Sequence, residues 1–173
     1  MDLPDASRRL LEAVPELDAQ IRFFPDGTKT AQDAADAIGC PVSAIVKSLV
    51  FVVIGEDGSE EPVVALVPGD LRLDTEALAS AAGATSSRRA SLDEVREATG
   101  YAAGGTPPFG HATSLEVFGD PLLRRNDPVW AAGGTPTTVF PISLGDLDRL
   151  AGPRWVSITT ISPTDIVQIP LNP

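Results

Sequence analysis

The chain has 173 residues, of which 43% are hydrophobic, and its 24 acidic and 13 basic side chains give a formal net charge of −11 at pH 7. This length and apolar content fit one compact domain over residues 1–173, and the acidic balance opposes docking along a nucleic-acid backbone, so DNA is excluded as a partner. No apolar run approaches the roughly 20 residues that cross a bilayer, and the first residues lack the apolar stretch of a signal peptide, so we expect a cytoplasmic protein without a membrane partner.

The first half of the chain predicts two helices separated by a short strand, followed by a long hairpin. Apolar residues at helical spacing predict a helix over residues 3–17, closed by Pro15, and a short strand near residues 21–24. Thr30 is a good N-cap for a second helix, which Gly39 ends. Residues 45–54 are apolar on both faces except at two positions, as in a buried central strand. Residues 62–67 return beside it as the paired strand.

The second half contains shorter elements in irregular order. Asp74 caps a predicted helix that runs through Ala82, and Ser91 with Glu94 forms a capping box for a helix that ends at Gly100. The remaining elements are strands near residues 114–118, 129–131 and 137–140, a helix capped by Ser143, and a strand-like tail over residues 155–159. Because strands and helices do not alternate regularly, we predict an α/β fold with a mixed, mainly antiparallel sheet or barrel surrounded by helices, not a doubly wound parallel fold.

Lys47 is the strongest candidate for a functional residue. A lysine within an apolar strand must either lose the hydration of its ammonium group or point toward a polar cavity. Strand alternation places Lys47 on the same face as Leu49 and Phe51, with Ser48 on the opposite face. The alternative is a lysine near a strand end that extends its ammonium group into solvent.

A loop with the sequence GGTPPFGH at residues 104–111 is the second candidate. Its glycines permit unusual torsions or a close approach of the backbone, and its prolines stiffen the connection. Such a loop can direct main-chain N–H groups at an oxyanion, although a purely structural loop remains the alternative. His111 is the only imidazole in the chain and could shuttle a proton or donate to a substrate oxygen.

Other features of the sequence favour structural interpretations. The six residues AAGGTP occur at 102–107 and again at 131–136, so two similar loops could face one site, or GGTP is simply a good turn. Asp120 precedes a proline, and we interpret it as a cap rather than a catalytic group. The single cysteine, Cys40, cannot form an intrachain disulfide and is interpreted as a packed residue rather than a nucleophile. With one histidine and one cysteine, we expect no metal and no other cofactor.

Several motifs in a fixed order resemble the YbaK/EbsC family, which includes prolyl-tRNA editing domains, both free-standing and inserted in synthetases. The motifs are TAQDAA at residues 30–35, IVKSLVF at 45–51, GGTPPFG at 104–110 and AGG at 132–134, and the resemblance covers about residues 21–150. It implies an aminoacyl-tRNA deacylase that edits in trans. Such an enzyme hydrolyses the ester joining a wrong amino acid, typically alanine or cysteine, to the proline tRNA.

The resemblance also implies roles for particular residues. Lys47 would hold the phosphate or ribose of the terminal adenosine, and the N–H groups of the loop would bind the ester carbonyl. The residues expected to be catalytic are Lys47, Gly105 and His111, and those expected to bind substrate are Gly104, Thr106, Pro107, Gly110, Gly133 and Gly134. Attack by the substrate itself or by a bound water agrees with the lack of a Ser-His-Asp or Cys-His arrangement.

The expected partners are the acceptor end of a tRNA and prolyl-tRNA synthetase, since so acidic a protein should bind tRNA weakly alone. Two prolines in the loop, where a small residue and one proline are expected, leave the amino-acid specificity open. An alternative is a binding module that recognises an aminoacyl ester, an amino acid or a protein without chemistry. A hydrolase of another ester or of a nucleotide is a third hypothesis.

Overall fold

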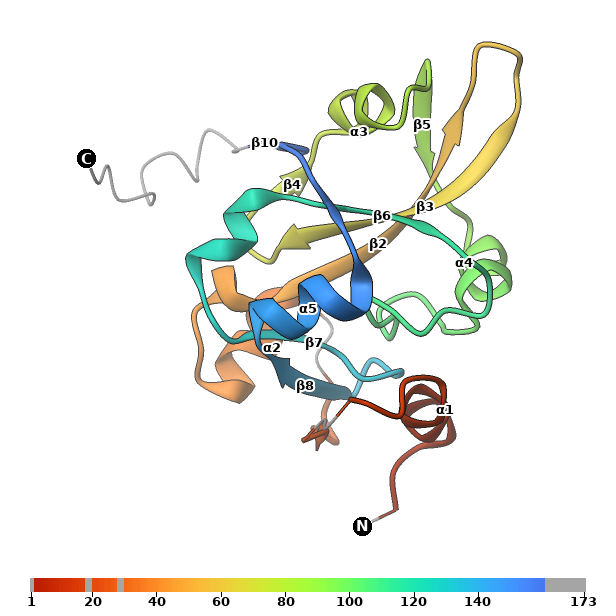
Figure 1. Ribbon diagram of the computed structural model, residues 1–173. Coiled ribbons are helices and arrows are strands. Elements are labelled where there is room, and N and C mark those ends of the chain that lie inside the picture. The colour runs from red at the N-terminus through yellow and green to blue at the C-terminus, as the bar shows by residue number, and fades with distance from the viewer. Residues whose placement is uncertain (1, 18–19, 28–29, 161–173) are drawn as a thin grey trace, which may run out of the picture.

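The fold is built around the central hairpin that the sequence predicts (Figure 1). The computed structural model describes residues 2–17, 20–27 and 30–160. Strands β2 (Val46–Ile54) and β3 (Glu60–Pro68) pair antiparallel along their whole length. Three shorter strands extend the hairpin to a five-stranded sheet in the order β5-β2-β3-β6-β9. They are β5 (Ser86–Arg89), antiparallel to β2, β6 (Glu116–Gly119), parallel to β3, and β9 (Arg154–Trp155), parallel to β6.

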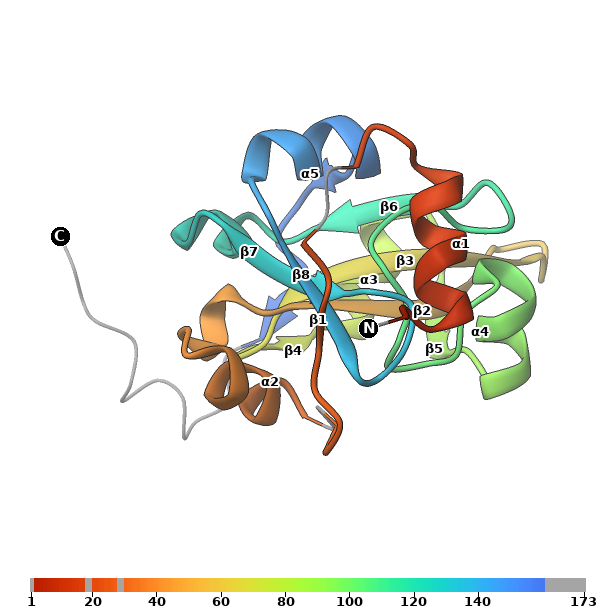
Figure 2. The same cartoon turned by 90° about the horizontal axis from the view of Figure 1, so that it is seen from below.

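Two small antiparallel sheets accompany the central one. The first has the order β1-β8-β7 and lies in front of the central sheet when the molecule is seen from below (Figure 2). It consists of β1 (Arg22–Phe23), β8 (Thr138–Ile142) and β7 (Val129–Ala132). The second pairs β4 (Arg72–Leu73) with β10 (Thr159–Thr160). A parallel bridge between Ile45 and Trp130 joins β7 to the start of β2, so the two larger sheets meet at this point.

Helices surround these sheets. In the described part of the chain they are α1 (Asp5–Ala13), α2 (Ala31–Ile38), α3 (Thr75–Ala81), α4 (Leu92–Thr99) and α5 (Leu144–Ala151), with 3-10 turns at Val42–Ala44 and Pro121–Arg125. Side-chain caps begin α2 and α4 as predicted: Thr30 Oγ1 accepts from the Asp33 N–H, and Ser91 and Glu94 form the capping box. Within the described residues no helix has the length and apolar character needed to cross a membrane.

The central sheet is buried on both faces, which explains the continuous apolar run of β2. On one face Val50 packs with Phe140 of the small sheet and Leu10 of α1. On the other face Phe51 packs with Leu78 of α3. Full burial of side chains of this size stabilises the fold by roughly 1.5–3 kcal/mol each, so the hairpin carries much of the core.

Two prolines of β3 lie where the sheet needs no donor. Val50 O accepts from the Ala90 N–H, so the main-chain groups of the even-numbered residues of β2 face away from β3. Pro62 and Pro68 lie opposite even-numbered residues of β2, so the ladder between β2 and β3 requires no N–H donor at either proline. On its other edge β3 pairs with β6 only through residues 63–66, so both prolines also lie just beyond β6.

The predicted fold class is confirmed, because helices surround sheets whose pairings are antiparallel except at β3–β6 and β6–β9. The prediction that Asp120 is a cap is also confirmed. This buried carboxylate accepts from the Leu122 N–H at 2.9 Å, the Ile158 N–H at 3.0 Å and Thr159 Oγ1 at 2.8 Å. It therefore ties the turn after β6 to the chain that leads into β10.

Three local predictions differ from the structure. The helix predicted over residues 3–17 covers only Asp5–Ala13, because Val14, directly before Pro15, leaves the helical conformation. The tail predicted as one strand over residues 155–159 forms two short strands, β9 and β10, which pair with different neighbours. Strands β4 and β5 are missing from the prediction. Because β5 reads Ser-Ser-Arg-Arg, no apolar alternation marks it.

Candidate functional site

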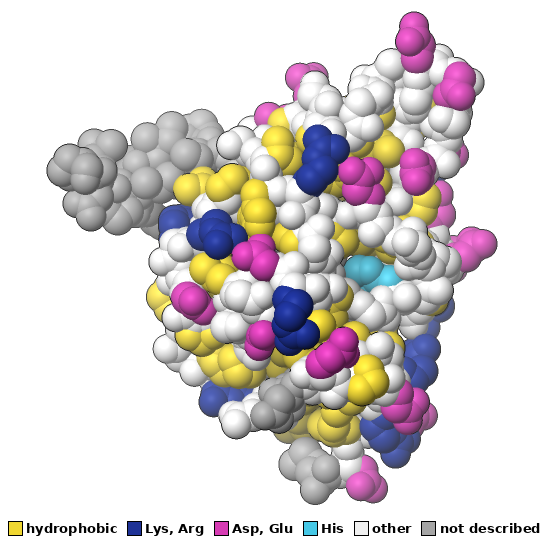
Figure 3. All heavy atoms as spheres, in the orientation of Figure 1, with side chains coloured by type: hydrophobic (Ala, Val, Ile, Leu, Met, Phe, Trp, Pro, Cys, Tyr) yellow, Lys and Arg dark blue, Asp and Glu magenta, His cyan; other side chains and the backbone are white. Residues whose placement is uncertain are grey.

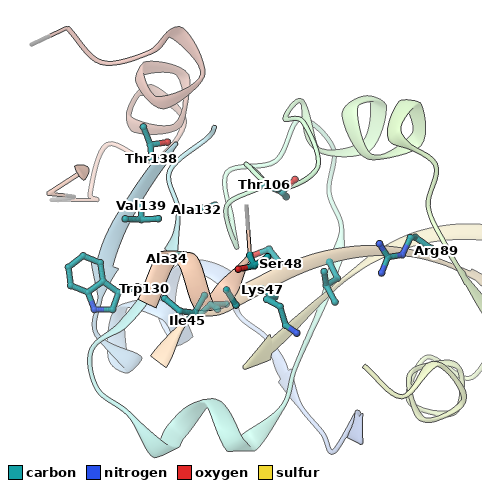
Figure 4. Close-up of a pocket in the computed structure, with 16 residues that line it drawn as sticks. Ala34, Ile45, Lys47, Ser48, Arg89, Thr106, Trp130, Ala132, Thr138 and Val139 are labelled. Carbon is teal, nitrogen blue, oxygen red and sulfur yellow. The ribbon is translucent and has the colours of Figure 1, made fainter. Parts of the chain in front are cut away.

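A cavity of about 330 Å³ lies beside one edge of β2 (Figure 4). Its walls come from α2, β2, the end of β5, the loop around residue 104, β7 and β8. Much of the lining is small and apolar, as at Ala34, Ala131 and Ala132. No lining residue in the described chain is Asp, Glu or His. The described residues also contain no group of three or more His, Cys, Asp or Glu that could hold a metal ion.

The cavity exists because one edge of β2 is only partly paired. Trp130 bridges to Ile45 at the start of the strand, and Ala90 donates to Val50 O further along. In the described part of the chain no strand pairs with this edge between those two points, because β5 reaches only residues 51–54. Ser48 lies in the middle of this gap, which we call the open edge of β2.

Lys47 lines the cavity, but its ammonium group is held by the protein. Nζ donates a hydrogen bond to Leu71 O at 2.6 Å, and the side chain is half-buried. Burial lowers the pKa of Lys47 from its ordinary value, with Arg72 acting in the same direction and Asp70 in the opposite one. Figure 4 shows the Lys47 ammonium group and the Ser48 hydroxyl on opposite sides of β2, as strand alternation predicts.

The loop at residues 104–110 contributes two residues to the cavity wall, Gly104 and Thr106. Its polar groups are largely used within the loop. The Gly105 N–H donates to Ala102 O at 3.0 Å, and Thr106 Oγ1 donates to the same oxygen at 3.1 Å. Gly104 has a φ of +85°, which favours glycine. In this conformation the Gly105 N–H serves the turn, so its predicted catalytic role would require the loop to rearrange.

The two AAGGTP segments pack against each other. A Cβ atom placed on Gly105 would lie 2.7 Å from Thr135 Cα, so no larger residue fits there without movement of the second loop. Gly133 and Gly134 of the second loop face α1 rather than the cavity. Gly133 O accepts from Ser7 Oγ at 2.6 Å, and a Cβ atom on Gly134 would lie 2.9 Å from the main chain of Ala6. Their neighbours at residues 131 and 132 line the cavity instead.

His111 lies outside the cavity lining. Its Nε2 is 2.7 Å from Pro107 O, and burial lowers the pKa of the imidazole although the contact with that carbonyl raises it. Gly110, beside it, has a φ of +73°, and a Cβ atom there would lie 3.1 Å from Leu10 and Val14 of α1. This half of the loop therefore packs on the first helix.

Two cations line the cavity without an ion pair among the described residues, Lys47 and Arg89. Arg89 lies opposite Phe51, on the face of the sheet that also carries Lys47. At the other end, the guanidinium of Arg22 packs 4.8 Å from the centre of the Trp130 ring. Acidic side chains gather near the tip of the β2–β3 hairpin in Figure 3, with basic ones scattered over the rest of that face. The cavity is thus locally basic in a strongly acidic protein.

The structure brings three of the predicted site residues to one cavity, Lys47, Gly104 and Thr106. The other predicted residues do not line the cavity, namely Gly105, Pro107, Gly110, His111, Gly133 and Gly134. Sequence reasoning missed Ser48, Arg89 and Trp130 as lining residues. Ser48 did carry a signal, because it is the second polar residue in an apolar strand. Arg89 carried none, because its strand has no apolar pattern.

Comparison with known proteins gives a consistent result. A family model described as an aminoacyl-tRNA editing domain matches residues 25–150, nearly the span over which the sequence motifs resemble a known family. The multifunctional Ser/Thr-tRNA deacylase ProXp-y of Escherichia coli (strain K12) is 34% identical over 153 residues, which cover 87% of this chain and 90% of that protein. Proline–tRNA ligase of Fervidobacterium nodosum is 33% identical over 109 residues, and this match spans 63% of the chain but only 18% of the ligase.

A solved structure agrees with these relatives. It is a crystal structure described as a candidate trans-editing enzyme for prolyl tRNA synthetase, with a TM-score of 0.82 and 38% sequence identity. The match covers 92% of this chain and 99% of that chain. The likeness therefore extends over nearly the full fold.

Proposed function

The chain belongs to the aminoacyl-tRNA editing domain family, and from this premise we propose that it hydrolyses, in trans, the ester of a tRNA carrying the wrong amino acid. The observation that carries the proposal is the cavity at the open edge of β2. At about 330 Å³ it lies at the small end of ligand sites, which run from roughly 300 to 1,000 Å³. Such a volume suits an aminoacyl group and its ribose better than a longer stretch of nucleic acid.

The proposed reaction needs no cofactor. Water adds to the carbonyl carbon of the ester, the bond from that carbon to the ribose oxygen breaks, and the ribose oxygen takes up a proton. The amino acid leaves as its carboxylate, and one proton is released to solvent. Because no Asp, Glu or His among the described residues lines the cavity to act as a general base, we assign the positioning of the attacking water to the substrate's own hydroxyl. We assign Lys47 to the phosphate or ribose of the terminal adenosine.

The amino acid removed is the finer part of the proposal. The family resemblance favours alanine or cysteine on the proline tRNA, while the name of the Escherichia coli relative favours serine and threonine. All four are small, and the small side chains at Ala34, Ala131 and Ala132 leave room for them. Discrimination among them depends on the shape of the pocket and on its polar contacts.

The expected partner is the acceptor end of a tRNA, delivered with the help of prolyl-tRNA synthetase. A chain with a net charge of −11 gains little from the phosphate backbone, so affinity for free tRNA should be weak. Similarity to a segment of a proline–tRNA ligase supports this choice of synthetase. Deacylation should then be faster in the presence of the ligase.

The test is deacylation of tRNA charged in turn with alanine, cysteine, serine, threonine and proline, with and without the ligase. We expect rapid release of at least one noncognate amino acid. Lys47→Ala should lower kcat/KM by about 10- to 100-fold, the typical loss when a charge-assisted contact is removed. No release from any of these substrates, with the ligase present, would reject the proposal.

A binding module is the second candidate, favoured by one observation: the Gly105 N–H, the expected oxyanion donor, is already bonded to Ala102 O. Such a module would hold an intact aminoacyl ester without cleaving it. Calorimetry with mischarged tRNA separates the two, because a lasting complex with intact substrate supports the module and turnover excludes it.

A further inference from the structure

Ser48 carries an unused hydroxyl at the wall of the cavity. Its Oγ atom is buried and has no hydrogen-bond partner in the described part of the protein, alone among the buried side-chain oxygens and nitrogens there. Buried polar groups are nearly always hydrogen-bonded, because an unmade bond costs stability. A hydroxyl left in this state beside a cavity is typical of a group that bonds only when a ligand is present.

The other hydroxyls at this cavity are engaged within the protein. Thr106 Oγ1 donates to Ala102 O, Thr138 Oγ1 contacts Thr135 Oγ1 at 2.8 Å, and Thr30 Oγ1 accepts from the Asp33 N–H in the first turn of α2. Ser48 Oγ can turn about a single bond without breaking a hydrogen bond. It is therefore the cavity hydroxyl that can reach a ligand at the lowest cost.

The main chain of Ser48 also offers a hydrogen-bond donor at this cavity. The carbonyl of Val50 accepts from Ala90, so the N–H and C=O of even-numbered residues in β2 face this edge of the sheet. Ser48 is two residues earlier, in the gap between the Trp130 bridge and β5. Its N–H thus faces the cavity at a point where no strand pairs with it in the described part of the chain. One residue offers two donors, an O–H and an N–H, at the open edge.

We propose that Ser48 holds the carbonyl oxygen of the aminoacyl ester with its hydroxyl and its main-chain N–H. This assignment rests on the proposed deacylase function. As water adds to the carbonyl carbon, negative charge develops on that oxygen, and preorganised donors stabilise it more strongly than they stabilise the ester. When the bond to the ribose oxygen breaks, the electron pair on the carbonyl oxygen re-forms the C=O double bond, and the ribose oxygen leaves with the bonding pair and takes up a proton. Ser48 forms no covalent bond in this step.

A nucleophilic role for Ser48 does not fit its surroundings. A serine nucleophile needs a neighbouring base to take its proton. No hydrogen bond joins Ser48 Oγ to any described residue, and the ammonium of Lys47 lies on the other side of β2. The donor role instead uses the proton that Ser48 keeps.

The test compares Ser48→Ala and Ser48→Thr with a matched control, Ser87→Ala. Ser87 is on β5, outside the cavity lining, and its hydroxyl donates to Thr75 O at 2.7 Å. Ser48→Ala should lower kcat by about 100-fold with little change in KM, as for the loss of one oxyanion donor. Ser48→Thr should recover much of the rate, and Ser87→Ala should retain it. Thermal unfolding should show the reverse order, with Ser48→Ala as stable as the wild type and Ser87→Ala less stable.

The choice of substrate separates this contact from one to the amino-acid side chain. Because every aminoacyl ester has the same carbonyl, the loss in Ser48→Ala should be equal for tRNA charged with alanine and with serine. A loss confined to serine and threonine would overturn the assignment to the ester. An active wild type whose rate survives Ser48→Ala would overturn it as well.

A second measurement does not depend on turnover. Calorimetry with 3′-alanylamido-3′-deoxyadenosine, an uncleavable analogue, should show several-fold weaker binding to Ser48→Ala than to the wild type. If the wild type proves inactive, the deacylase proposal fails, but this difference in affinity would still support the Ser48 contact. Equal affinities for wild type and variant, or no binding by either, would reject it.

Discussion

The loop at residues 104–111 and the open edge of β2 border the same cavity, yet they differ in how their polar groups are satisfied. In the loop, the Gly105 N–H, the Thr106 hydroxyl and the His111 ring all have partners within the same turn. At the strand edge, the Ser48 hydroxyl has none in the described chain. A glycine-rich sequence suggests available N–H groups, but here it serves a close contact between two loops. The groups free to meet a ligand lie on the regular strand.

The largest expected effect concerns the role of the loop in the fold. Gly105→Ala should lower the free energy of unfolding by about 1–3 kcal/mol, because the added Cβ would meet the main chain of Thr135 and Gly134. Chemical denaturation measures this change. The control is Gly145→Ala in α5, where an added Cβ would make only an ordinary van der Waals contact, 4.0 Å from Ser143 Oγ, and alanine has the better helix propensity, so stability should stay the same or rise.

This substitution also tests the contrast with Ser48. If Gly105→Ala left stability unchanged and removed activity alone, the loop would carry the chemistry and the contrast between loop and strand edge would be lost. The contrast between loop and strand edge would be established if Gly105→Ala loses stability while Ser48→Ala loses rate but not stability.

A smaller effect is expected at the basic end of the cavity. Arg89→Ala should raise KM for aminoacyl-tRNA several-fold and reduce the dependence of kcat/KM on salt, because an exposed cation contributes mainly through long-range attraction to phosphate. Steady-state kinetics at two or more salt concentrations measure both changes. Arg96→Ala is the matched control, an exposed arginine on α4 outside the cavity lining. If Arg89→Ala and Arg96→Ala changed KM and the salt dependence of kcat/KM equally, Arg89 would have no specific role in binding the substrate.

The smallest effect concerns pH. Burial lowers the pKa of His111 below its ordinary value of 6.5. Well above pH 6.5 the ring is neutral in both the folded and the unfolded chain and adds no pH dependence. As the pH falls below 6.5, the unfolded chain takes up the proton first, so stability declines. The Tm of the wild type should therefore fall as the pH is lowered from 7 to 5.5, and His111→Gln should make this fall in Tm smaller.

Activity decides whether His111 also takes part in the reaction. If it belongs only to the internal structure of the loop, His111→Gln should keep most of its kcat/KM between pH 6.5 and 8. A large loss of activity at unchanged thermal stability would instead assign the imidazole to proton transfer. The loop at residues 104–111 would then contribute to the chemistry, as the open edge of β2 does.

The sequence predicts the central part of this fold well because its signals are local. The apolar run of β2 and the caps at Thr30 and Ser91 each depend on neighbouring residues. Motif order also identifies the family, and Lys47, Gly104 and Thr106 are found at one cavity. Sequence did not predict β5, whose polar residues form a strand only because β2 offers an edge.

The remaining site predictions depend on tertiary contacts that a sequence does not display. Gly133 and Gly134 resemble a ligand loop, but they allow α1 to approach. Whether an N–H is free depends on its partner, as Gly105 and Ala102 illustrate. Ser48 was visible as a polar residue in an apolar strand, but its missing hydrogen bond could be recognised only in three dimensions.

The position of Pro62 has a consequence for the protein's behaviour in a crowded solution. Strand β6 is shorter than β3 and leaves the exposed first residues of that edge of β3 unpaired, where Pro62 lies, whereas Pro68 at the other end is buried. An uncovered strand edge can recruit a strand from another molecule and begin aggregation. A proline offers no N–H for such a pairing and so interrupts the template. The hairpin at the centre of the fold thereby carries its own protection against self-association.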